Sequence, residues 1–507
     1  MRIWFARRGC SWPLERCRFP TEQMLLTLFP GEKPEYPEEP PGHMTGGRGV
    51  LITLSRGERM ASVSVRVTLE GRRRGALARF PSEKLDEPDK QVYHTVSHAL
   101  KQAFYKAGTA LLGFDLPWGS LTGVRPVKLP TRAMLTGGTA GQAERELRTK
   151  YRVSAPRAAL AVECARAALD VGRGLDPRGL ALYIGIPFCP TRCAYCSFVS
   201  ADVKRSLALV EPYVDALCRE IGLAGGLLRE RGLHISCAYM GGGTPTTLPS
   251  EQLDRVLAAV EAHLPMERCA EFTVEAGRPD TITADKLEVL RAHGIRRISI
   301  NPQTMEDRVL RAMGRAHTAA QIEQAMELAR LHFGGLVNMD LIAGLPSDSP
   351  EGFGRTLDRV LAMDPANITV HTLALKKGSR LTQEGGDLCP PEAVEAMLAL
   401  ADNRLREAGY GPYYLYRQKY MSGSFENVGW TKPGALCAYN IVMMEELQTV
   451  LSLGAGGITK LVDGENRKIL RLSNPKYARE YLDSWEKVAA SKRTAAEFQA
   501  LLAARNE

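Results

Sequence analysis

The sequence predicts an α/β protein whose centre is an open, partial (β/α)6 barrel, with an α+β domain before it and an α+β extension after it. The main observation is a series of six short apolar runs from Leu180 onward, separated by amphipathic stretches of helical periodicity. Strands and helices alternating at this spacing imply right-handed crossovers and a parallel sheet. Six units fall short of the eight that close a full barrel, so the barrel is expected to be open.

Each expected strand is a short apolar run bounded by polar residues or glycine. The six strands are predicted at 180–186, 235–240, 271–276, 296–301, 336–345 and 368–375, and the helices between them at 210–231, 250–264, 283–294 and 319–333. In such folds the active site forms at the carboxyl ends of the strands, so residues just after each run are candidates.

Composition changes along the chain predict four regions. Residues 1–115 form an N-terminal α+β domain, with a hairpin at 49–69 and a helix at 93–112, and residues 116–177 form a helical connecting segment. The barrel occupies 178–385, and a C-terminal domain associated with the substrate follows at 386–507, beginning with an amphipathic helix at 391–410.

Charge and apolar patterning restrict the classes of function. The 507 residues include 66 Lys and Arg against 57 Asp and Glu, a net charge of +9 that favours anionic partners. The basic residues are scattered, so a polyanionic small molecule fits as well as nucleic acid, and no nucleic-acid module is expected. No apolar run approaches the ~18 residues of a membrane span, and the start lacks the apolar centre of a secretion signal, which predicts a cytoplasmic protein.

Three of the eleven cysteines stand close together in "CPTRCAYCSF", directly after the first strand. Cys189, Cys193 and Cys196 can hold three irons of a cubane cluster and leave the fourth iron without a protein ligand. A structural zinc site would need a fourth ligand, and no Cys or His follows closely after Cys196, but a zinc site and the absence of any metal remain alternatives. The other eight cysteines are expected to be structural or incidental, since isolated cysteines usually behave as small buried hydrophobes.

Further candidates lie at the ends of the later strands. In "YMGGGTPTTL", Gly242, Gly243 and Thr244 let backbone amides approach a ligand closely. The later candidates are polar residues at or near strand ends: Glu275, Gln303, Asp340 and, on the helix after Gln303, Arg315. A buried lone carboxylate is costly without a partner, so convergence on a zwitterionic, ribose-bearing ligand would explain the set.

The cysteine triplet, with Tyr195 before its last member, resembles the signature of the radical S-adenosylmethionine superfamily. That resemblance implies a [4Fe-4S] cluster whose open iron is chelated by S-adenosylmethionine, which one electron cleaves to methionine and a 5'-deoxyadenosyl radical. The order of the motifs "YIGIPFCPTRCAYCSF", "GGGTPT", "SINPQT" and "MDLIAGLP" is similar to that of the oxygen-independent coproporphyrinogen III oxidases. Residues 116–130 and 413–460 resemble the branch called the coproporphyrinogen dehydrogenase HemZ.

The resemblance implies a role for each matching residue. Tyr183 would lie beside the cofactor as a catalytic residue. The implied cofactor-binding residues are Tyr183, Tyr195, Gly242, Gly243, Thr244, Glu275, Gln303, Arg315, Asp340 and Ala374. One departure is Phe198, which stands where the best-known oxidase branch has a further cysteine.

The implied function is oxygen-independent oxidative decarboxylation of coproporphyrinogen III to protoporphyrinogen IX, with an electron donor for the cluster and a separate electron acceptor as partners. The four propionates of that substrate need cationic partners, for which the candidates are Arg125, Lys128, Arg417 and Lys419. Two alternatives are a haem-binding chaperone without decarboxylase activity, although no aromatic-rich His-Asn motif is found near the C-terminus, and a radical enzyme that modifies tRNA.

Overall fold

The computed structural model describes residues 1–38, 47–196, 201–203, 206–376, 379–384, 388–418, 424–464 and 468–505. The chain forms two compact units, Met1–Val162 and Glu163–Glu507. Each unit is described by itself below. Helix α5 (Ala155–Arg173) runs across the boundary.

The first unit contains a four-stranded sheet in the order β1-β2-β3-β4. The hairpin predicted at 49–69 is confirmed as the antiparallel pair β2 and β3, whose alternate residues, such as Val63 and Val65, are fully buried. Strand β1 was not predicted; it pairs parallel with β2, which makes β1-α1-β2 a crossover unit. The elements are β1 (Arg2–Arg8), α1 (Arg18–Leu28), β2 (Gly49–Arg56), β3 (Met60–Leu69), β4 (Arg72–Pro81), α2 (Asp89–Leu112), α3 (Lys128–Leu135) and α4 (Ala140–Lys150).

Charge is divided unevenly between the two units. Residues 1–162 include 26 Lys and Arg against 15 Asp and Glu, a net charge of +11. Residues 163–507 include the other 40 Lys and Arg and 42 Asp and Glu, a net charge of −2. The basic excess that looks scattered along the sequence therefore belongs to the first unit.

The second unit is built on an eleven-stranded sheet that contains all six predicted strands. These six are parallel neighbours in chain order, which confirms the predicted partial barrel. Both faces of such a sheet are covered, so its strands read as continuous apolar runs in the sequence. The strands are β5 (Gly179–Ile186), β8 (His234–Gly242), β9 (Phe272–Glu275), β10 (Arg297–Ser299), β11 (Leu336–Ala343) and β12 (Asn367–Thr372).

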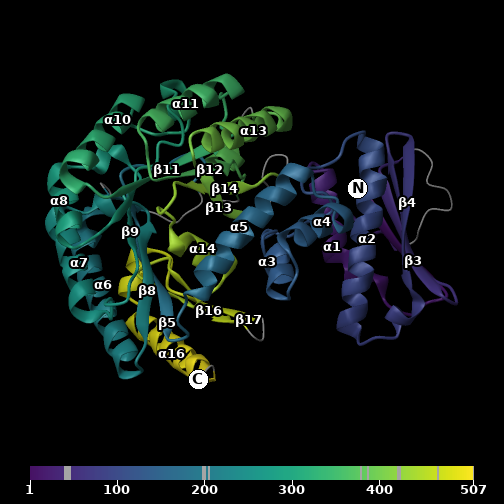
Figure 1. The fold of residues 1–507 in the computed structure, drawn as a ribbon, viewed down its shortest axis with the longest axis horizontal. Coiled ribbons are helices and arrows are strands. Elements are labelled where there is room, and N and C mark those ends of the chain that lie inside the picture. The colour runs from purple at the N-terminus through teal and green to yellow at the C-terminus, as the bar shows by residue number, and fades with distance from the viewer. Residues whose placement is uncertain are drawn as a thin grey trace. The chain divides into compact units, whose positions relative to one another are not determined.

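Helices that connect these strands lie in an arc outside the sheet (Figure 1). The second of them, α7, buries Leu253, Val256 and Val260 at the spacing of one helix face. The helices are α6 (Leu207–Glu230), α7 (Ser250–His263), α8 (Ala284–Ala292), α9 (Asp307–Ala312), α10 (Ala319–Leu328), α11 (Pro350–Ala362), α12 (Arg380–Glu384) and α13 (Pro391–Glu407).

The C-terminal part of the chain adds strands to both sides of the six-stranded core. Strand β15 pairs parallel with β5, while β14 pairs antiparallel with β12. The region that the sequence marks as an extension is therefore continuous with the central sheet. Its elements are β13 (Gly411–Tyr416), β14 (Asn427–Thr431), α14 (Ala438–Glu445), β15 (Val450–Leu453), β16 (Ile458–Asp463), β17 (Lys468–Ser473), α15 (Ala478–Leu482) and α16 (Trp485–Arg505).

A buried ion pair joins α16 to α6 behind strand β5. Lys492 Nζ lies 3.1 Å from Glu220 Oε1, and both side chains are almost fully excluded from solvent. The other carboxylate oxygen of Glu220 accepts hydrogen bonds from the Gly454 amide at 2.7 Å and the Tyr481 hydroxyl at 2.6 Å. The pair thus holds the loop after β15 against α6, the helix that follows the cysteine loop in the chain. Among the helices of the described ranges, none is both long and apolar enough to cross a membrane.

Candidate active site

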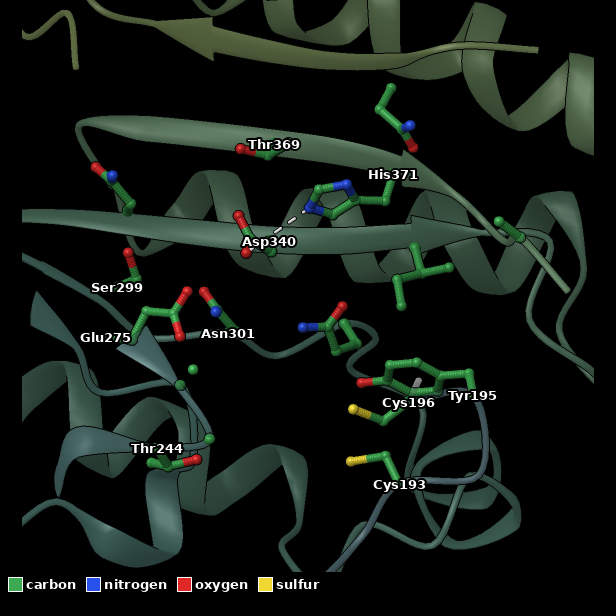
Figure 2. Close-up of a pocket in the computed structure, with 18 of the residues that line it drawn as sticks. Cys193, Tyr195, Cys196, Thr244, Glu275, Ser299, Asn301, Asp340, Thr369 and His371 are labelled. Atoms are coloured by element: carbon green, nitrogen blue, oxygen red, sulfur yellow. Dashed lines mark ion pairs between the residues drawn. The ribbon is translucent and has the colours of Figure 1, made fainter. Parts of the chain in front are cut away.

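A cavity of about 430 Å³ opens at the carboxyl ends of the parallel strands (Figure 2). Every residue that the sequence analysis assigned to the cluster or the cofactor lines it: Tyr183, Cys189, Cys193, Tyr195, Cys196, Gly242, Gly243, Thr244, Glu275, Gln303, Arg315, Asp340 and Ala374. These residues come from segments up to about 190 positions apart in the sequence, and the ends of neighbouring parallel strands bring them together.

The cysteine loop follows β5 and the short strand β6 (Phe188–Cys189). Its conformation is held by neighbours, since the Ala194 amide donates to the Met313 carbonyl and the Leu381 amide donates to the Ala194 carbonyl, each at 3.0 Å. The Cys193 and Cys196 side chains point from this loop into the cavity (Figure 2). The Cys189 sulfur lies 3.6 Å from the Thr244 hydroxyl.

The three thiols do not form a site for a single ion. Among the described residues, no three Cys, His, Asp or Glu side chains are grouped so that they could hold one metal ion. A cubane cluster needs a different arrangement, because each of its cysteine ligands binds a separate iron.

The glycine turn after β8 binds the cysteine loop through its backbone. The Gly243 amide donates to the Ile186 carbonyl and the Thr244 amide to the Phe188 carbonyl, both at 2.7 Å. Gly242 has a φ of +109°, which side chains rarely tolerate, and a Cβ on Gly243 would lie 2.3 Å from the Phe188 carbonyl oxygen. Glycine is therefore required here for packing against the cysteine loop as well as for access to the cavity.

A half-buried carboxylate lies at the end of β9. The Tyr239 hydroxyl donates a 2.6 Å hydrogen bond to Glu275 Oε1. Burial is the main cause that raises the pKa of Glu275 to about 7, with the nearby Asp340 carboxylate adding to it, while the Tyr239 and Gly242 hydrogen bonds act in the opposite direction. Glu275 can thus be neutral or charged near neutral pH, depending on what binds beside it.

Gln303 is joined through its backbone to Asp340, which lies within β11. The Gln303 amide donates to the Asp340 carbonyl, and Gln303 has a φ of +67°, a conformation that is uncommon for a residue with a side chain. The Asp340 carboxylate lies 3.8 Å from His371 Nε2 on β12 (Figure 2). Both side chains line the cavity.

Arg315 is a buried cation on the side of the cavity near the cysteines. Its guanidinium donates to the Tyr195 hydroxyl at 3.1 Å and to the Asn301 carbonyl at 2.8 Å. The charge of Arg315 opposes the burial that raises the pKa of the Tyr195 hydroxyl. Arg315 therefore ties the residue before Cys196 to the segment after β10.

The cavity wall also contains polar atoms that lack a partner. The Asn301 side-chain oxygen and the Tyr439 hydroxyl are buried without a hydrogen bond to any residue that the structure describes. Such atoms are costly unless a ligand or water satisfies them. Together with three thiols and carboxylates, they fit a zwitterionic nucleoside ligand beside a metal cluster. The amides of Gly243 and Thr244, which the sequence analysis expected to approach a ligand, donate instead to carbonyls of the segment before Cys189.

Several residues of the cavity were missed by the sequence analysis. Tyr239 stacks on Tyr439 with ring centroids 4.9 Å apart, and Met443 and Met444 on α14 also line the cavity. Other missed wall residues are Arg278, His371, Asn440, Tyr414 and Tyr416. The segment "LCAYN" contains Tyr439 and Asn440 but no histidine, so it does not match a His-Asn motif.

The four predicted substrate cations lie in different places. Arg125 and Lys128 belong to the first unit, and Lys419 lies outside the described residues, as does Phe198. Arg417 is buried, its guanidinium donates to the Ser424 carbonyl at 2.8 Å, and burial lowers its pKa to about 10. The cations at the cavity wall are instead Arg192, Lys376, Arg278 and Arg315.

Comparison with known proteins agrees with this geometry. Residues 183–360 match the Radical SAM superfamily. A solved structure described as coproporphyrinogen III oxidase (HemN) from Escherichia coli, a radical SAM enzyme, superposes with a TM-score of 0.50 at 25% identity, covering 64% of this chain and 72% of that one. The fold and the site thus define a radical SAM protein.

The family can be stated more narrowly. The chain is 36% identical over 430 residues to the oxygen-independent coproporphyrinogen-III oxidase-like protein HemZ of Bacillus subtilis, which covers 83% of this chain and 85% of that protein. It therefore belongs to the HemZ family of coproporphyrinogen-III oxidase-like radical SAM proteins. It is also 28% identical over 317 residues to the heme chaperone HemW of Escherichia coli, covering 62% of this chain and 79% of that protein.

Proposed function

We propose that this protein catalyses the oxygen-independent oxidative decarboxylation of coproporphyrinogen III to protoporphyrinogen IX. The observation that carries the proposal is the convergence of three thiols, a glycine turn and the polar ends of the later strands in one cavity. Its relatives include a protein named coproporphyrinogen-III oxidase-like and a structure named coproporphyrinogen III oxidase.

Cys189, Cys193 and Cys196 would hold a [4Fe-4S] cluster. The residues that would hold S-adenosylmethionine are Tyr183, Tyr195, Gly242, Gly243, Thr244, Glu275, Gln303, Arg315, Asp340 and Ala374. When bound, these groups supply a 5'-deoxyadenosyl radical that abstracts a hydrogen atom from a propionate side chain. Loss of carbon dioxide and one electron then leaves a vinyl group, so each of two rounds needs an electron acceptor, and the cluster needs an electron donor.

The chain's own residues would orient the reactants and exclude water. The hydrogen bond from Tyr239 and the Gly242 backbone would hold Glu275 toward the cofactor, and Arg315 with Tyr195 would fix the cysteine loop. The rings of Tyr239 and Tyr439 and the thioethers of α14 offer an apolar wall for a tetrapyrrole. Arg192 and Lys376 are cations at the cavity wall that could bind its carboxylates.

The test is anaerobic turnover of coproporphyrinogen III with S-adenosylmethionine and a strong reductant, followed by mass spectrometry. The expected product is protoporphyrinogen IX, detected after oxidation as protoporphyrin, through a tricarboxylate intermediate. Cofactor cleavage without any loss of carbon dioxide from the substrate would reject the proposal.

A haem chaperone is the second candidate, and one observation favours it. His371, Met443 and Met444 line the same cavity, and His and Met are the side chains that ligate haem iron in cytochromes. Stoichiometric haem binding by the purified protein, with a Soret band that His371→Ala abolishes, would support this function in place of decarboxylation.

A further inference from the structure

We propose that Arg278 is a positioning residue that raises the reduction potential of the cluster by holding a buried positive charge against Cys193. The inference rests on the proposed cluster site and adds to it a residue that the resemblance does not imply. Arg278 follows β9 and precedes the short helix η5 (Pro279–Thr281).

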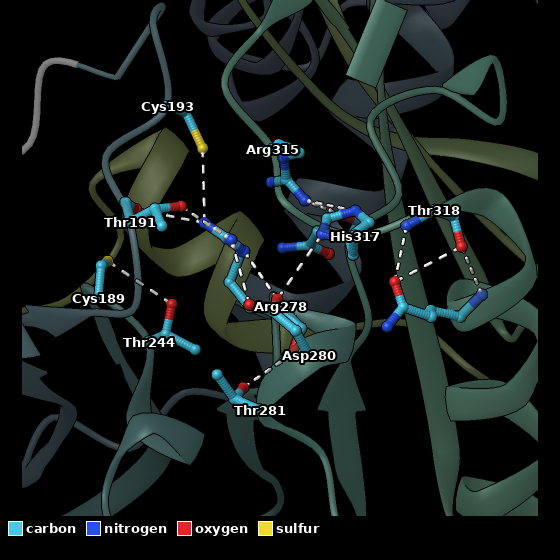
Figure 3. A network of polar contacts seen from close by, with 12 residues as sticks. Cys189, Thr191, Cys193, Thr244, Arg278, Asp280, Thr281, Arg315, His317 and Thr318 are labelled. Carbon is cyan, nitrogen blue, oxygen red and sulfur yellow. Dashed lines mark hydrogen bonds and ion pairs between the residues drawn. The ribbon is translucent and has the colours of Figure 1, made fainter. Parts of the chain in front are cut away.

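The guanidinium of Arg278 reaches the cysteine loop directly (Figure 3). Its Nη1 lies 3.9 Å from the Cys193 sulfur and 3.2 Å from the Thr191 carbonyl, and Nη2 donates to the Thr191 hydroxyl at 3.0 Å. The residue is 3% exposed. One side of the guanidinium fork therefore faces a thiol that is a predicted cluster ligand.

The other side of the fork faces Asp280. Nε and Nη2 lie 3.1 Å and 3.3 Å from its two carboxylate oxygens, and His317 Nδ1 lies 3.7 Å from the same carboxylate. His317 in turn contacts Arg315 at 3.5 Å. Asp280 keeps Arg278 oriented, so that the cation is near Cys193 and the balancing anion is on the far side.

This orientation predicts the direction in which Arg278 changes the reduction potential of the cluster. Reduction adds one negative charge to the cluster, which a nearby cation and N–H···S contacts stabilise. Because Arg278 is excluded from solvent, its field is screened less than that of an exposed residue. The arrangement should therefore make the cluster easier to reduce.

The experiment is a redox titration of anaerobically purified, reconstituted full-length protein, followed by electron paramagnetic resonance of the reduced cluster. Iron content is measured first for every variant. In Arg278→Gln, we expect roughly tenfold less reduced cluster relative to oxidised cluster at a fixed solution potential, which for a one-electron couple is a midpoint shift of about 59 mV to more negative potential.

Two further variants test the direction of the shift in midpoint potential and whether the shift requires a buried charge. Asp280→Asn removes the balancing anion, so its midpoint should move in the opposite direction. Arg311→Gln removes the same charge from an exposed position on α9, close in sequence to the Met313 carbonyl that binds the cysteine loop, and should change the ratio less than threefold.

Each outcome decides the question. Equal midpoints in wild type, Arg278→Gln and Asp280→Asn would overturn the proposal. Should Arg278→Gln lose its iron, Arg278→Lys keeps a cation there, and loss of iron in both would assign Arg278 a purely structural role and also overturn it. The titration needs no porphyrin substrate, so it can succeed where decarboxylation fails; a wild-type protein that binds no cluster would instead refute the proposed function.

Discussion

The Tyr239 hydroxyl donates a 2.6 Å hydrogen bond to Glu275, and its ring stacks with those of Tyr183 and Tyr439, with centroid separations of 6.4 Å and 4.9 Å. These contacts connect β5, β8, β9 and α14 at the cavity wall. They also determine the surroundings of a carboxyl group that titrates close to neutral pH.

The first prediction concerns the stability of the protein without cofactor. The pKa of Glu275 rises from 4.5 to about 7 on folding, so the folded state favours the protonated form. The stabilisation from this proton is complete below about pH 4.5 and is lost as the pH rises through 7. Glu275→Gln, which cannot ionise, should therefore be more stable than wild type at pH 8, by at most roughly 3 kcal/mol.

Urea unfolding at pH 5 and at pH 8 measures this difference. The advantage of Glu275→Gln over wild type should shrink markedly between pH 8 and pH 5. Tyr239→Phe, which removes a contact that lowers the pKa, should make the loss of stability continue to a higher pH than in wild type. A stability difference between Glu275→Gln and wild type that does not depend on pH would contradict the raised pKa of Glu275.

The second prediction concerns the cluster. Replacing Cys189, Cys193 or Cys196 by Ala removes one of three thiolates, and the described structure offers no neighbouring cysteine to replace it at this loop. Each variant should lose the brown colour and cofactor cleavage together, while Cys218→Ala on α6 should keep both. About four irons per chain retained by the triple variant would exclude this ligand set.

The third prediction follows from the glycine turn. Gly243→Ala would place a Cβ within 2.3 Å of the Phe188 carbonyl oxygen, so the backbone just before Cys189 must shift. We expect lower iron content as well as weaker S-adenosylmethionine binding. Gly226→Ala is the matched control, since its Cβ meets nothing within 4 Å on helix α6 and should stabilise the helix by about 1 kcal/mol. Full iron content in Gly243→Ala would contradict the prediction, because the cysteine loop would then accommodate the added Cβ.

The sequence was sufficient for the six strands and for the residues at their ends, because buried parallel strands have apolar runs and their carboxyl ends meet at one edge. The Arg278 to Cys193 contact joins positions 85 residues apart, and no local pattern marks it. Helix α14 was equally hidden, because an apolar segment such as "AYNIVMME" fits an ordinary core helix. Its place at the cavity follows from the C-terminal strands, which join both sides of the sheet. Strand pairing between distant segments determines this arrangement, and local secondary-structure propensity does not reveal it.

The fourth prediction concerns the buried pair behind β5. Removing one partner of a buried ion pair leaves an uncompensated charge, so Lys492→Met should destabilise the second unit by roughly 3–5 kcal/mol. Glu220→Gln combined with Lys492→Met should recover part of that loss, because no charge remains buried. Thermal unfolding of the two variants tests this, and equal stabilities would contradict it.

The last prediction separates two cations that could bind the substrate. Lys376 lines the cavity after β12, whereas Arg417 is buried with its guanidinium on the Ser424 carbonyl. A charge-assisted contact with a propionate contributes roughly 1.5–3 kcal/mol, so Lys376→Gln should raise the coproporphyrinogen concentration needed for half-maximal turnover about ten- to hundredfold. Lys376 also lies close enough to Cys196 to interact with it electrostatically, so substrate-free cleavage of S-adenosylmethionine is measured as the control and should change much less than the substrate requirement. Arg417→Ala should instead lower the midpoint of thermal unfolding, because it removes the buried hydrogen bond from Arg417 to the Ser424 carbonyl. The prediction is contradicted if Lys376→Gln leaves the coproporphyrinogen concentration for half-maximal turnover unchanged while a fully stable Arg417→Ala raises it. Arg417 would then be the residue that binds the substrate carboxylate.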